Sequence, residues 1–514
     1  MQPMVNTNSL LEPDACYLAL KARDARVDGR FFIGVTSTGI YCRPVCNVRL
    51  PRRENCRFFN HAAKAESAGF RPCLRCRPEL APQAVVWSIQ DASSILAHQA
   101  ARLLDEPEAW GETDLSVENL AGKLGVSDRH LRRIFEAKLG VSPMQYLQTR
   151  RLLTAKQLLA DTDLPITQVA LSSGYASLRR FNAAFVAHYK LNPSQLRRAG
   201  SASSGRGIGV RLGYRPPYDV LAIGAFLQQR QVNTIELVTN DADQTSMGRT
   251  LRLQSGGKSY SGWLMAQFEP ARSQLVLQVS DSLREALPTV IRRVRGMFDL
   301  DADPHAINHV LHASFPMGDG LRVPGALDGF ELAVRAVLGQ QITVAAARTL
   351  AQRLVDKFGD AIATPYPGLS RLFPTAAALA QVSPDALGAL GIVKQRQRAI
   401  LALAQAVAEG GLQLNAGADV AATTAALTAL PGIGDWTAQY IAMRALRWPD
   451  AFPSGDVALH NALGVRELKQ PAREAEARSQ IWRPWRSYAV LRAWASLPAP
   501  VKKQPKENKE RKSK

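Results

Sequence analysis

All six cysteines of this 514-residue chain lie between Cys16 and Cys76, which separates a short cysteine-bearing start from a long cysteine-free remainder. Four of them form two close pairs, Cys42/Cys46 and Cys73/Cys76, with the segment 47–72 between the pairs. Two close pairs that converge from separate segments are typical of Zn²⁺ held tetrahedrally by four thiolates. In a large intracellular chain, clustered cysteines favour metal binding over a disulfide framework.

The four-cysteine pattern alone admits two interpretations: a zinc site that only stabilises a small domain, or a site with reactive sulfur. Residues 14–80 contain 13 Lys/Arg and 6 Asp/Glu. Four thiolates on Zn²⁺ leave a net charge of about −2, which makes the sulfur electron-rich. A basic surface would bring such a site to a DNA backbone, which favours the reactive interpretation. Cys16 and Cys56 fall outside the pattern and are predicted to be small buried hydrophobic residues.

The net charge of +20 predicts a polyanionic partner: nucleic acid or, less often, an anionic membrane. No apolar run approaches the roughly 18 residues that cross a bilayer. Residues 1–14 lack the basic and apolar regions of a signal peptide, so we expect an intracellular, cytoplasmic protein.

The length predicts three or four domains, at roughly 150 residues each. Residues 197–209 (RRAGSASSGRGIG) have the composition of a linker, and a softer boundary lies near residues 78–83. The end of the chain has seven basic and two acidic residues and no aromatic residue, as in a disordered basic tail. We therefore expect four blocks and a tail, at residues 1–82, 83–200, 206–285, 286–498 and 499–514.

One internal repeat relates residues 125–143 to residues 174–193. Each copy has a small turn residue, a basic amphipathic helix and a terminal proline. The predicted core stripes are Leu131, Phe135 and Leu139 in the first copy, and Leu178, Phe181 and Phe185 in the second. A short turn before a basic helix, twice, fits two recognition helices in successive major grooves. The alternative is a pair of amphipathic helices with solvated basic faces. The candidate DNA-binding residues are Arg129, Arg132, Arg133, Arg179 and Arg180.

The second half of the chain changes its periodicity. Residues 206–285 alternate with a period of two, as at Leu275, Leu277 and Val279, with a glycine pair at 256–257 marking a turn, so we predict strands there. Beyond residue 286, Ala- and Leu-rich segments with short Pro/Gly breaks predict a helical domain.

Residues 430–438 (LPGIGDWTA) predict a tight turn between two helices. Glycines at Gly432 and Gly434 permit backbone conformations that point N–H groups toward an anion. Asp435 is a candidate cap for the following helix, whose positive end favours phosphate. An ordinary helix–helix turn is the alternative. Downstream, Asp456 follows a Pro/Gly-containing turn, where a lone aspartate is most often a helix N-cap.

The cysteine region resembles a known family. Residues 39–46 (GIYCRPVC) and 69–78 (GFRPCLRCRP) are similar to the N-terminal domain of Ada-type adaptive-response regulators. The resemblance implies zinc bound by the four paired cysteines. It also implies an irreversible, stoichiometric transfer of a methyl group from a DNA methyl phosphotriester to Cys42. The repeat region resembles the AraC-type activator domain, which follows the zinc domain in that family.

Residues 212–498 resemble helix-hairpin-helix DNA glycosylases, and within them the 3-methyladenine DNA glycosylase II type. The resemblance rests on the hairpin with Asp456 and on segments such as 335–340 (RAVLGQ) and 485–489 (WRSYA). It implies that Asp456 is the catalytic carboxylate, which stabilises positive charge on the sugar and orients or deprotonates water. The implied base pocket comprises Trp436, Tyr440 and Trp494, suited to cationic alkylated purines through cation–π contacts. Their alternative role is core packing. The implied DNA-backbone hairpin is Pro431, Gly432, Ile433 and Gly434.

Two positions depart from the patterns of related glycosylases. Trp436 stands where bifunctional relatives carry a Schiff-base lysine, which predicts a monofunctional enzyme without lyase activity. Gln341 stands where the family inserts an apolar wedge into the base stack. No cysteine follows Cys76, so repair of O6-methylguanine by a second methyltransferase domain is not expected.

The expected fold is multidomain, mainly α with α+β parts: a small zinc α+β domain, an AraC-type double helix-turn-helix, a small antiparallel-sheet α+β domain and a helix-hairpin-helix glycosylase domain. The expected function is DNA alkylation repair, which excises bases such as 3-methyladenine, joined to a methyl acceptor and a transcription regulator. The expected partners are alkylated double-stranded DNA, promoter DNA and RNA polymerase. We expect a bacterial, nucleoid-associated monomer. The alternatives are a transcription regulator with degenerate repair centres and a zinc-stabilised DNA-binding scaffold.

Overall fold

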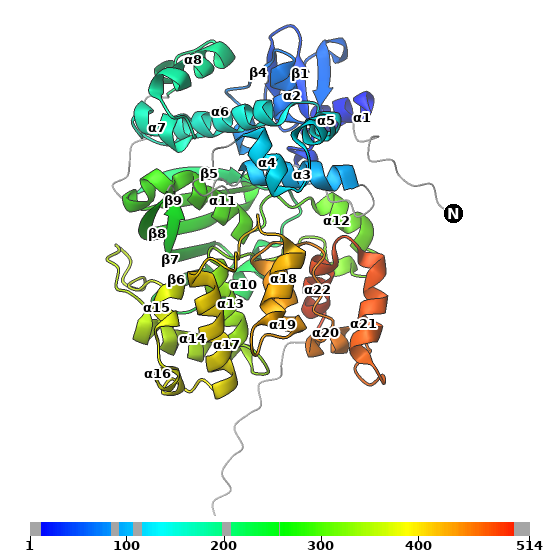
Figure 1. Ribbon diagram of the computed structural model, residues 1–514. Helices are drawn as coiled ribbons and strands as arrows, with labels where there is room; N and C mark the ends of the chain where they lie inside the picture. The colour runs from blue at the N-terminus through cyan, green and yellow to red at the C-terminus, as the bar shows by residue number, and fades with distance from the viewer. Residues whose placement is uncertain (1–11, 84–91, 106–115, 198–206, 256, 498–514) are drawn as a thin grey trace, which may run out of the picture.

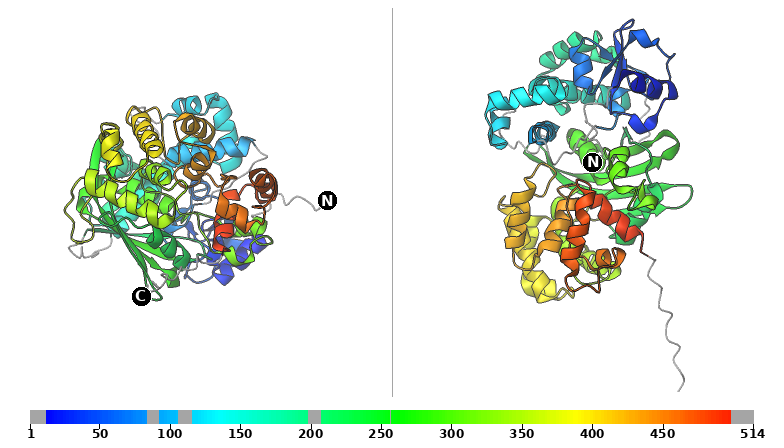
Figure 2. Two further views of the ribbon diagram at one scale, coloured as in Figure 1. Left: turned by 90° about the horizontal axis from the view of Figure 1, so that it is seen from below. Right: turned by 90° about the vertical axis from the view of Figure 1, so that its right-hand side faces the viewer.

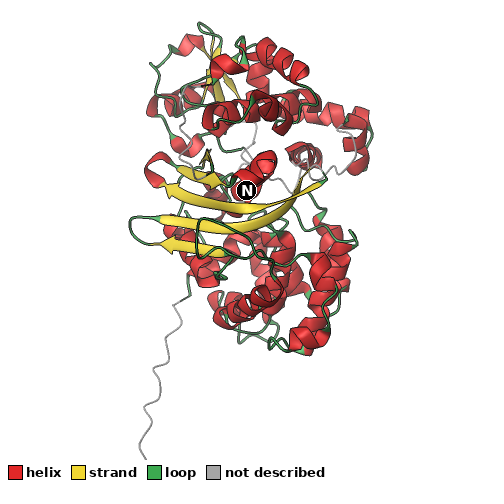
Figure 3. Cartoon of the chain, turned by 90° about the vertical axis from the view of Figure 1, so that its left-hand side faces the viewer, coloured by secondary structure: helices red, strands yellow, loops and turns green. Residues whose placement is uncertain are grey.

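The chain, described by a computed structural model over residues 12–83, 92–105, 116–197, 207–255 and 257–497, stacks three layers of structure. The cysteine region and the repeat region lie at the top of Figure 1, a five-stranded sheet lies in the middle, and the C-terminal helices lie below. The side view shows the sheet with helices above and below it (Figure 3). Within the described residues, no helix is long and apolar enough to cross a membrane. The predicted basic tail and most of the predicted linker lie outside them.

The cysteine region forms a four-stranded sheet in the order β3-β1-β2-β4, in which only the β2–β4 pair is parallel. Cys16 and Cys56 are buried among aromatic and aliphatic residues, as predicted. The elements of this region are α1 (Pro13–Ala22), β1 (Phe32–Val35), β2 (Ile40–Cys42), β3 (Cys56–Phe59), α2 (Ala62–Ser67) and β4 (Arg71–Pro72).

The repeat region is helical, and its two copies fold alike. In each, a serine caps a basic helix, a residue with positive φ ends that helix, and a proline begins the next one. The long helix α6 joins the two halves. The elements are α3 (Ala92–Asp105), α4 (Val117–Lys123), α5 (Asp128–Leu139), α6 (Pro143–Asp161), α7 (Ile166–Ser172), α8 (Leu178–Tyr189) and α9 (Pro193–Leu196).

The core stripe is confirmed in the first copy, where Leu131, Phe135 and Leu139 are buried. In the second copy, Phe181 and Phe185 are fully buried, but Leu178 is 38% exposed, so its predicted place in the stripe is wrong. Leu178 is the first residue of α8, where the helix has only begun to meet its neighbours. Hydrophobic periodicity therefore predicts burial poorly for the residues at the end of a helix.

The middle layer is antiparallel throughout, in the order β5-β9-β8-β7-β6. The predicted alternation of Leu275, Leu277 and Val279 is confirmed, since all three are buried on one face of β9. In the chain, the helix α10 lies between β5 and β6. The elements are β5 (Ile208–Gly213), α10 (Val220–Arg230), β6 (Glu236–Asn240), β7 (Thr245–Ser255), β8 (Lys258–Glu269) and β9 (Gln274–Val279).

The C-terminal layer is helical, as predicted, and is seen from two further sides in Figure 2. Its helices are α11 (Leu287–Met297), α12 (Pro304–Leu311), α13 (Gly329–Leu338), α14 (Val344–Phe358), α15 (Ala376–Ala380), α16 (Pro384–Gly388), α17 (Lys394–Ala408), α18 (Val420–Ala429), α19 (Asp435–Arg444), α20 (Val457–Ala462), α21 (Pro471–Ser479) and α22 (Arg486–Ala495).

The layers share hydrophobic and polar contacts rather than sitting apart. One continuous core includes buried residues of the repeat region from Leu152 to Leu196 together with those of the five-stranded sheet. At the boundary with the cysteine region, the fully buried guanidinium of Arg215 donates to backbone oxygens of both halves, including those of Asp28 and Asp301. The halves of the chain therefore form one packed body.

Candidate functional site

The four paired cysteines converge because of the strand pairing. Cys42 is the last residue of β2 and Cys73 directly follows β4, and the two strands run parallel with Tyr41 opposite Pro72. Their parallel register therefore brings the ends of both strands, and with them both cysteine pairs, to one corner. The four sulfur atoms lie within 4.8 Å of one another.

This geometry fits zinc. A tetrahedral ion with Zn–S bonds of about 2.3 Å places its sulfur atoms roughly 3.8 Å apart. Two sulfurs also accept backbone N–H groups, at 3.3 Å from Arg43 to Cys76 and at 3.4 Å from Arg75 to Cys73. Such donors stabilise thiolate charge, as at other metal sites where neighbouring groups tune the ligands. The cluster therefore indicates zinc as the cofactor.

The basic residue next to the first ligand is not available to DNA. Arg43 is buried, its Nε donates to Asp28 at 2.9 Å, and its Nη1 donates to the carbonyl of Cys76 at 3.0 Å. It therefore braces the loop that carries two of the cysteines. Electrostatic attraction of DNA phosphates to the four-cysteine site therefore has to come from the exposed arginines around it.

The five arginines predicted to bind DNA are exposed on α5 and α8. Arg132 forms ion pairs with Glu118 at 3.1 Å and with Asp128 at 3.8 Å. In the part of the chain that the structure describes, no carboxylate pairs with Arg129, Arg179 or Arg180. These three are therefore better placed to bind phosphate or base edges.

The predicted hairpin joins α18 to α19 at residues 430–434. Gly432 has φ +78°, a conformation that L side chains rarely adopt, and its carbonyl accepts from Nε2 of Gln340 at 3.0 Å. Gly434 has an ordinary φ of −90° and open space beside it, so only one of the two glycines is required by its backbone. The cap prediction for Asp435 is wrong: this residue is the first of α19, and no side chain caps the helix.

Asp456 is held by two tryptophans. Nε1 of Trp436 donates to its Oδ2 at 2.9 Å, and Nε1 of Trp494 donates to its Oδ1 at 2.9 Å. Oδ1 also accepts the backbone N–H of Leu459, so the aspartate caps α20 as well. A carboxylate with both oxygens engaged is fixed in direction, as electrostatic stabilisation of a developing cation requires.

The predicted aromatic residues stand together around this carboxylate. Trp436 and Tyr440 lie four residues apart on one face of α19 and stack with ring centres 5.4 Å apart and planes 9° from parallel. Trp494 approaches from α22, with its ring centre 6.4 Å from that of Tyr440. All three are half-buried and, with Asp456, line one cavity of about 760 Å³.

Gln341 lies at the exposed turn between α13 and α14, and its φ of +55° is unusual for a residue with a side chain. Its neighbour Gln340 was not predicted to have a role, yet its amide donates to the hairpin and to Oγ1 of Thr437 at 2.9 Å. The turn and the hairpin are thereby fixed to each other. A glutamine just after an apolar helical segment carries no sequence signal of this contact.

The cavity also contains charged residues that the sequence did not indicate. Arg230 from α10 and Arg444 from α19 line it, together with the uncharged ring of Phe226 from α10. Arg444 is 8% exposed and donates to the Tyr440 hydroxyl at 2.7 Å. Burial acts to raise the pKa of the Tyr440 phenol, but the charges of Arg444 and Arg230 outweigh it and hold this pKa below its ordinary value. The spacing of four residues places Arg444 on the same helix face as Trp436 and Tyr440, but it does not indicate that the charge of Arg444 is buried.

Four family models match successive parts of the chain. They are described as the metal binding domain of Ada, a helix-turn-helix domain, the AlkA N-terminal domain and the HhH-GPD superfamily of base excision DNA repair proteins. They match residues 15–79, 120–199, 209–328 and 334–487, respectively.

Curated relatives match nearly the whole chain or one part of it. A protein of Mycobacterium tuberculosis, named probable bifunctional transcriptional activator/DNA repair enzyme AlkA, is 38% identical over 511 residues, which is 96% of this chain and 99% of that protein. DNA-3-methyladenine glycosylase 2 of Escherichia coli is 34% identical over 283 residues, 55% of this chain and 95% of that protein. The bifunctional transcriptional activator/DNA repair enzyme Ada of Escherichia coli is 36% identical over 165 residues, 32% of this chain and 43% of that protein.

Proposed function

The chain belongs to the family of bifunctional transcriptional activators and DNA repair enzymes that join an Ada-type region to an AlkA-type glycosylase, and from this premise we propose which residues act in each half. The molecule is an alkylation repair protein with a zinc-binding domain, an AraC-type helix-turn-helix region and a DNA glycosylase. The proposed boundaries of its parts remain residues 1–82, 83–200, 206–285 and 286–498.

In the glycosylase half, Asp456 is the catalytic carboxylate. The observation that carries this assignment is the pair of indole N–H groups from Trp436 and Trp494, which donate to both oxygens of a carboxylate that lines the cavity. A flipped base enters beside Tyr440, its sugar lies against the carboxylate, and water attacks the sugar carbon as the base leaves. The product is an intact abasic strand, because no lysine stands at position 436.

The assay that tests this assignment is base release from DNA carrying 3-methyladenine, with the wild type and Asp456→Asn. Asparagine removes the negative charge and turns an N–H donor toward one of the two indole donors. Loss of one preorganised electrostatic group costs on the order of 10²–10³ in rate. The variant should still bind DNA. Near-normal base release by Asp456→Asn would contradict the assignment.

DNA is held at two further places, the hairpin and the turn that carries Gln341. The hairpin residues Pro431, Gly432, Ile433 and Gly434, together with the uncapped start of α19, bind backbone phosphate. Gln341, exposed on a turn fixed to that hairpin, fills the gap left by the flipped base. Replacing Gln341 by alanine should weaken the binding of damaged DNA only modestly.

In the Ada-type half, Cys42, Cys46, Cys73 and Cys76 hold the zinc ion, and Cys42 accepts the methyl group. Cys73 and Cys76 accept backbone N–H groups, whereas among the described residues no N–H group donates to Cys42. A thiolate without such donors keeps more of its nucleophilicity. The sulfur attacks the methyl carbon, the bond from that carbon to the phosphotriester oxygen breaks, and the phosphodiester leaves with the electron pair.

The helix-turn-helix half recognises promoter DNA through Arg129, Arg132, Arg133, Arg179 and Arg180 and activates transcription by contacting RNA polymerase. Arg129, Arg179 and Arg180 have no carboxylate partner in the described part of the chain, which supports their role. The protein acts as a monomer on the bacterial nucleoid. Neutralising Arg179 and Arg180 together should weaken promoter binding and reduce the salt dependence of the affinity.

A further inference from the structure

The two surfaces that we assign to DNA lie at opposite ends of the molecule. In Figure 1, α8 is at the top and α5 lies above α3, whereas α18 and α19, which the hairpin joins, belong to the lower layer. The side view agrees, with the sheet between the upper helices and the C-terminal helices (Figure 3). The helix-turn-helix surface and the glycosylase surface are therefore separated by the sheet layer.

The hairpin is at the end of α18 and α19 that is remote from the repeat region. At the start of α18, Arg102 of α3 donates to the carbonyl of Ala416. Just beyond the end of α19, Arg447 lines a cavity together with Asp105 of α3. Each of the two helices has ten residues, so the hairpin lies roughly 15 Å farther from α3 than these contacts do.

The recognition helices are displaced in the other direction. α5 packs on α3, and α8 packs on α7, which in turn contacts the segment Asp281–Ala286 that follows β9. A helix with its side chains is about 10 Å across, so each recognition helix stands one helix farther from the hairpin. Arg129, Arg179 and Arg180 are exposed on these two helices. DNA that contacts them approaches the end of the molecule opposite the hairpin.

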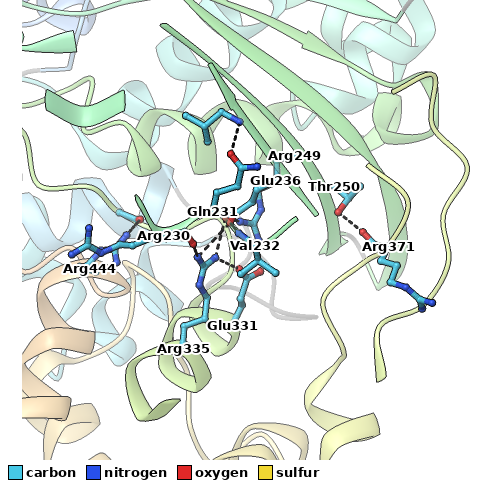
Figure 4. Close-up of polar contacts among 12 residues, drawn as sticks. Arg230, Gln231, Val232, Glu236, Arg249, Thr250, Glu331, Arg335, Arg371 and Arg444 are labelled. Carbon is cyan, nitrogen blue, oxygen red and sulfur yellow. Dashed lines mark hydrogen bonds and ion pairs between the residues drawn. The ribbon is translucent and has the colours of Figure 1, made fainter. Parts of the chain in front are cut away.

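The body between the two surfaces is packed on both sides of the sheet. Above it, α6 to α9 share one hydrophobic core with the strands. Below it, Arg249 of β7 pairs with Glu236 of β6 and with Glu331 of α13, and Arg335 of α13 lies 2.9 Å from both glutamates. Figure 4 shows these four side chains meeting between the sheet and α13. Breaking a buried ion-pair network is costly, so packing fixes how the two surfaces face.

A single short duplex does not fit this arrangement. To contact both ends, it would have to turn back on itself around the molecule. The persistence length of DNA is about 150 base pairs, and bending 20–30 base pairs by 40–90° already costs on the order of 1–6 kcal/mol. Two binding surfaces add to each other's affinity only where geometry permits both to be engaged.

We propose that one molecule binds two separate segments of DNA at once and so bridges them, one across α5 and α8 and the other at the hairpin. This inference rests on the DNA-binding roles proposed above for the two halves. A molecule held at a promoter then keeps its glycosylase cavity free for a second segment. Activation of transcription and excision of a base do not compete for one surface.

The experiment is two-colour sedimentation of the full chain with two duplexes of about 60 base pairs, less than half a persistence length. One duplex is undamaged, and the other carries a central tetrahydrofuran analogue of an abasic site. Each has its own dye, and both are in excess over the protein at low salt. The wild type should form a complex of one chain with two duplexes.

Two variants each disable one end. Changing Arg129, Arg179 and Arg180 together to alanine should leave one duplex per chain, and that duplex should be mainly the abasic one. Gly434→Asp acts at the hairpin, where φ is −90° and the space is open, so the side chain fits. Aspartate is a favoured N-cap, and its carboxylate engages the N–H groups that we assign to phosphate. It should weaken binding of the abasic duplex roughly tenfold or more.

Arg272→Ala is the matched control, because Arg272 is an exposed arginine of the sheet layer, paired with Glu269 at 3.5 Å. It should keep both duplexes. A wild-type complex with only one duplex, while both disabled variants still bind one, would overturn the inference, as would two chains in every complex that carries both dyes. If the triple arginine variant does not prefer the abasic duplex, the proposed glycosylase function fails instead. If Gly434→Asp binds no undamaged duplex, the proposed role of α5 and α8 fails.

Discussion

Arg215 gives the sharpest test of how the two halves of the chain are held together. Its side chain is fully buried, and its three nitrogens make five hydrogen bonds of 2.7–3.1 Å. All five acceptors are backbone carbonyls, and they come from three segments that are far apart in the sequence: those of Asp28, Pro82, Gln83, Asp301 and Ala302. We expect Arg215→Met to release the cysteine region from the glycosylase half.

The magnitude follows from these five bonds. A hydrogen bond from a charged donor contributes about 1.5–3 kcal/mol, and a buried acceptor left without a donor costs about 1–3 kcal/mol. Water entering the gap recovers part of this cost, so we expect a loss of about 5 kcal/mol. A loss of that size lowers the midpoint of unfolding by about 10 °C for a unit of roughly 200 residues.

The assay is differential scanning calorimetry together with limited proteolysis of the full chain. Arg215→Met should show an early transition that the wild type lacks, and faster cleavage between residues 78 and 92. Arg211→Met is the matched control, because Arg211 lies on β5, which ends two residues before Arg215, and its side chain is exposed. A variant that unfolds within about 2 °C of the wild type, in the same pattern, would refute the role given to Arg215.

Three other outcomes are expected. Borohydride should trap no covalent adduct between the enzyme and damaged DNA, since Trp436 stands where a Schiff-base lysine would be; a trapped adduct contradicts monofunctional chemistry. Reaction with methyl-phosphotriester DNA should add one methyl group to Cys42 by mass spectrometry and tighten promoter binding at low salt, because the charge of the zinc site changes from about −2 to about −1. A methyl group on the half-buried Cys76 instead, or equal affinities before and after, would refute that switch. Asp299→Asn should stabilise the protein above pH 6. Burial raises the pKa of Asp299 to about 6 from 3.8, so the folded state binds the proton more tightly than the unfolded state does. The wild type therefore loses up to about 3 kcal/mol of folding stability as the pH rises from about 4 to 6. Asparagine also tolerates the φ of +50° at this position; equal stabilisation at pH 3.5 and pH 8 would contradict the assignment to this carboxyl group.

The features that the sequence determined are local ones. The spacing of Cys42/Cys46 and Cys73/Cys76 predicts a metal site, because ligand spacing within a short loop limits the geometry it can adopt. The two helix-turn-helix copies follow from a serine cap and a proline that lie close together in each copy. The hairpin follows from Gly432, whose φ of +78° few other residues tolerate.

Near the candidate glycosylase site, the sequence predicted which residue types would meet but not how. Trp436 and Tyr440 share a helix face by their spacing. The two indole N–H groups on Asp456, in contrast, come from two separate helices, α19, which begins at Asp435, and α22, which begins at Arg486. The burial of Arg444 depends on α10, which belongs to the sheet layer and precedes the whole helical layer in the chain. No periodic pattern contains such information.

Only the tertiary structure decided that the four predicted blocks are not independent. A Ser/Gly/Arg-rich stretch indicates a flexible joint, yet the helices before it share one hydrophobic core with the sheet after it. Arg215 has no sequence signal either, because its partners are backbone carbonyls, which every residue carries. The composition of a segment predicts the structure that the segment prefers by itself. The burial of apolar faces and the pairing of backbone groups depend instead on which surfaces the whole chain brings together.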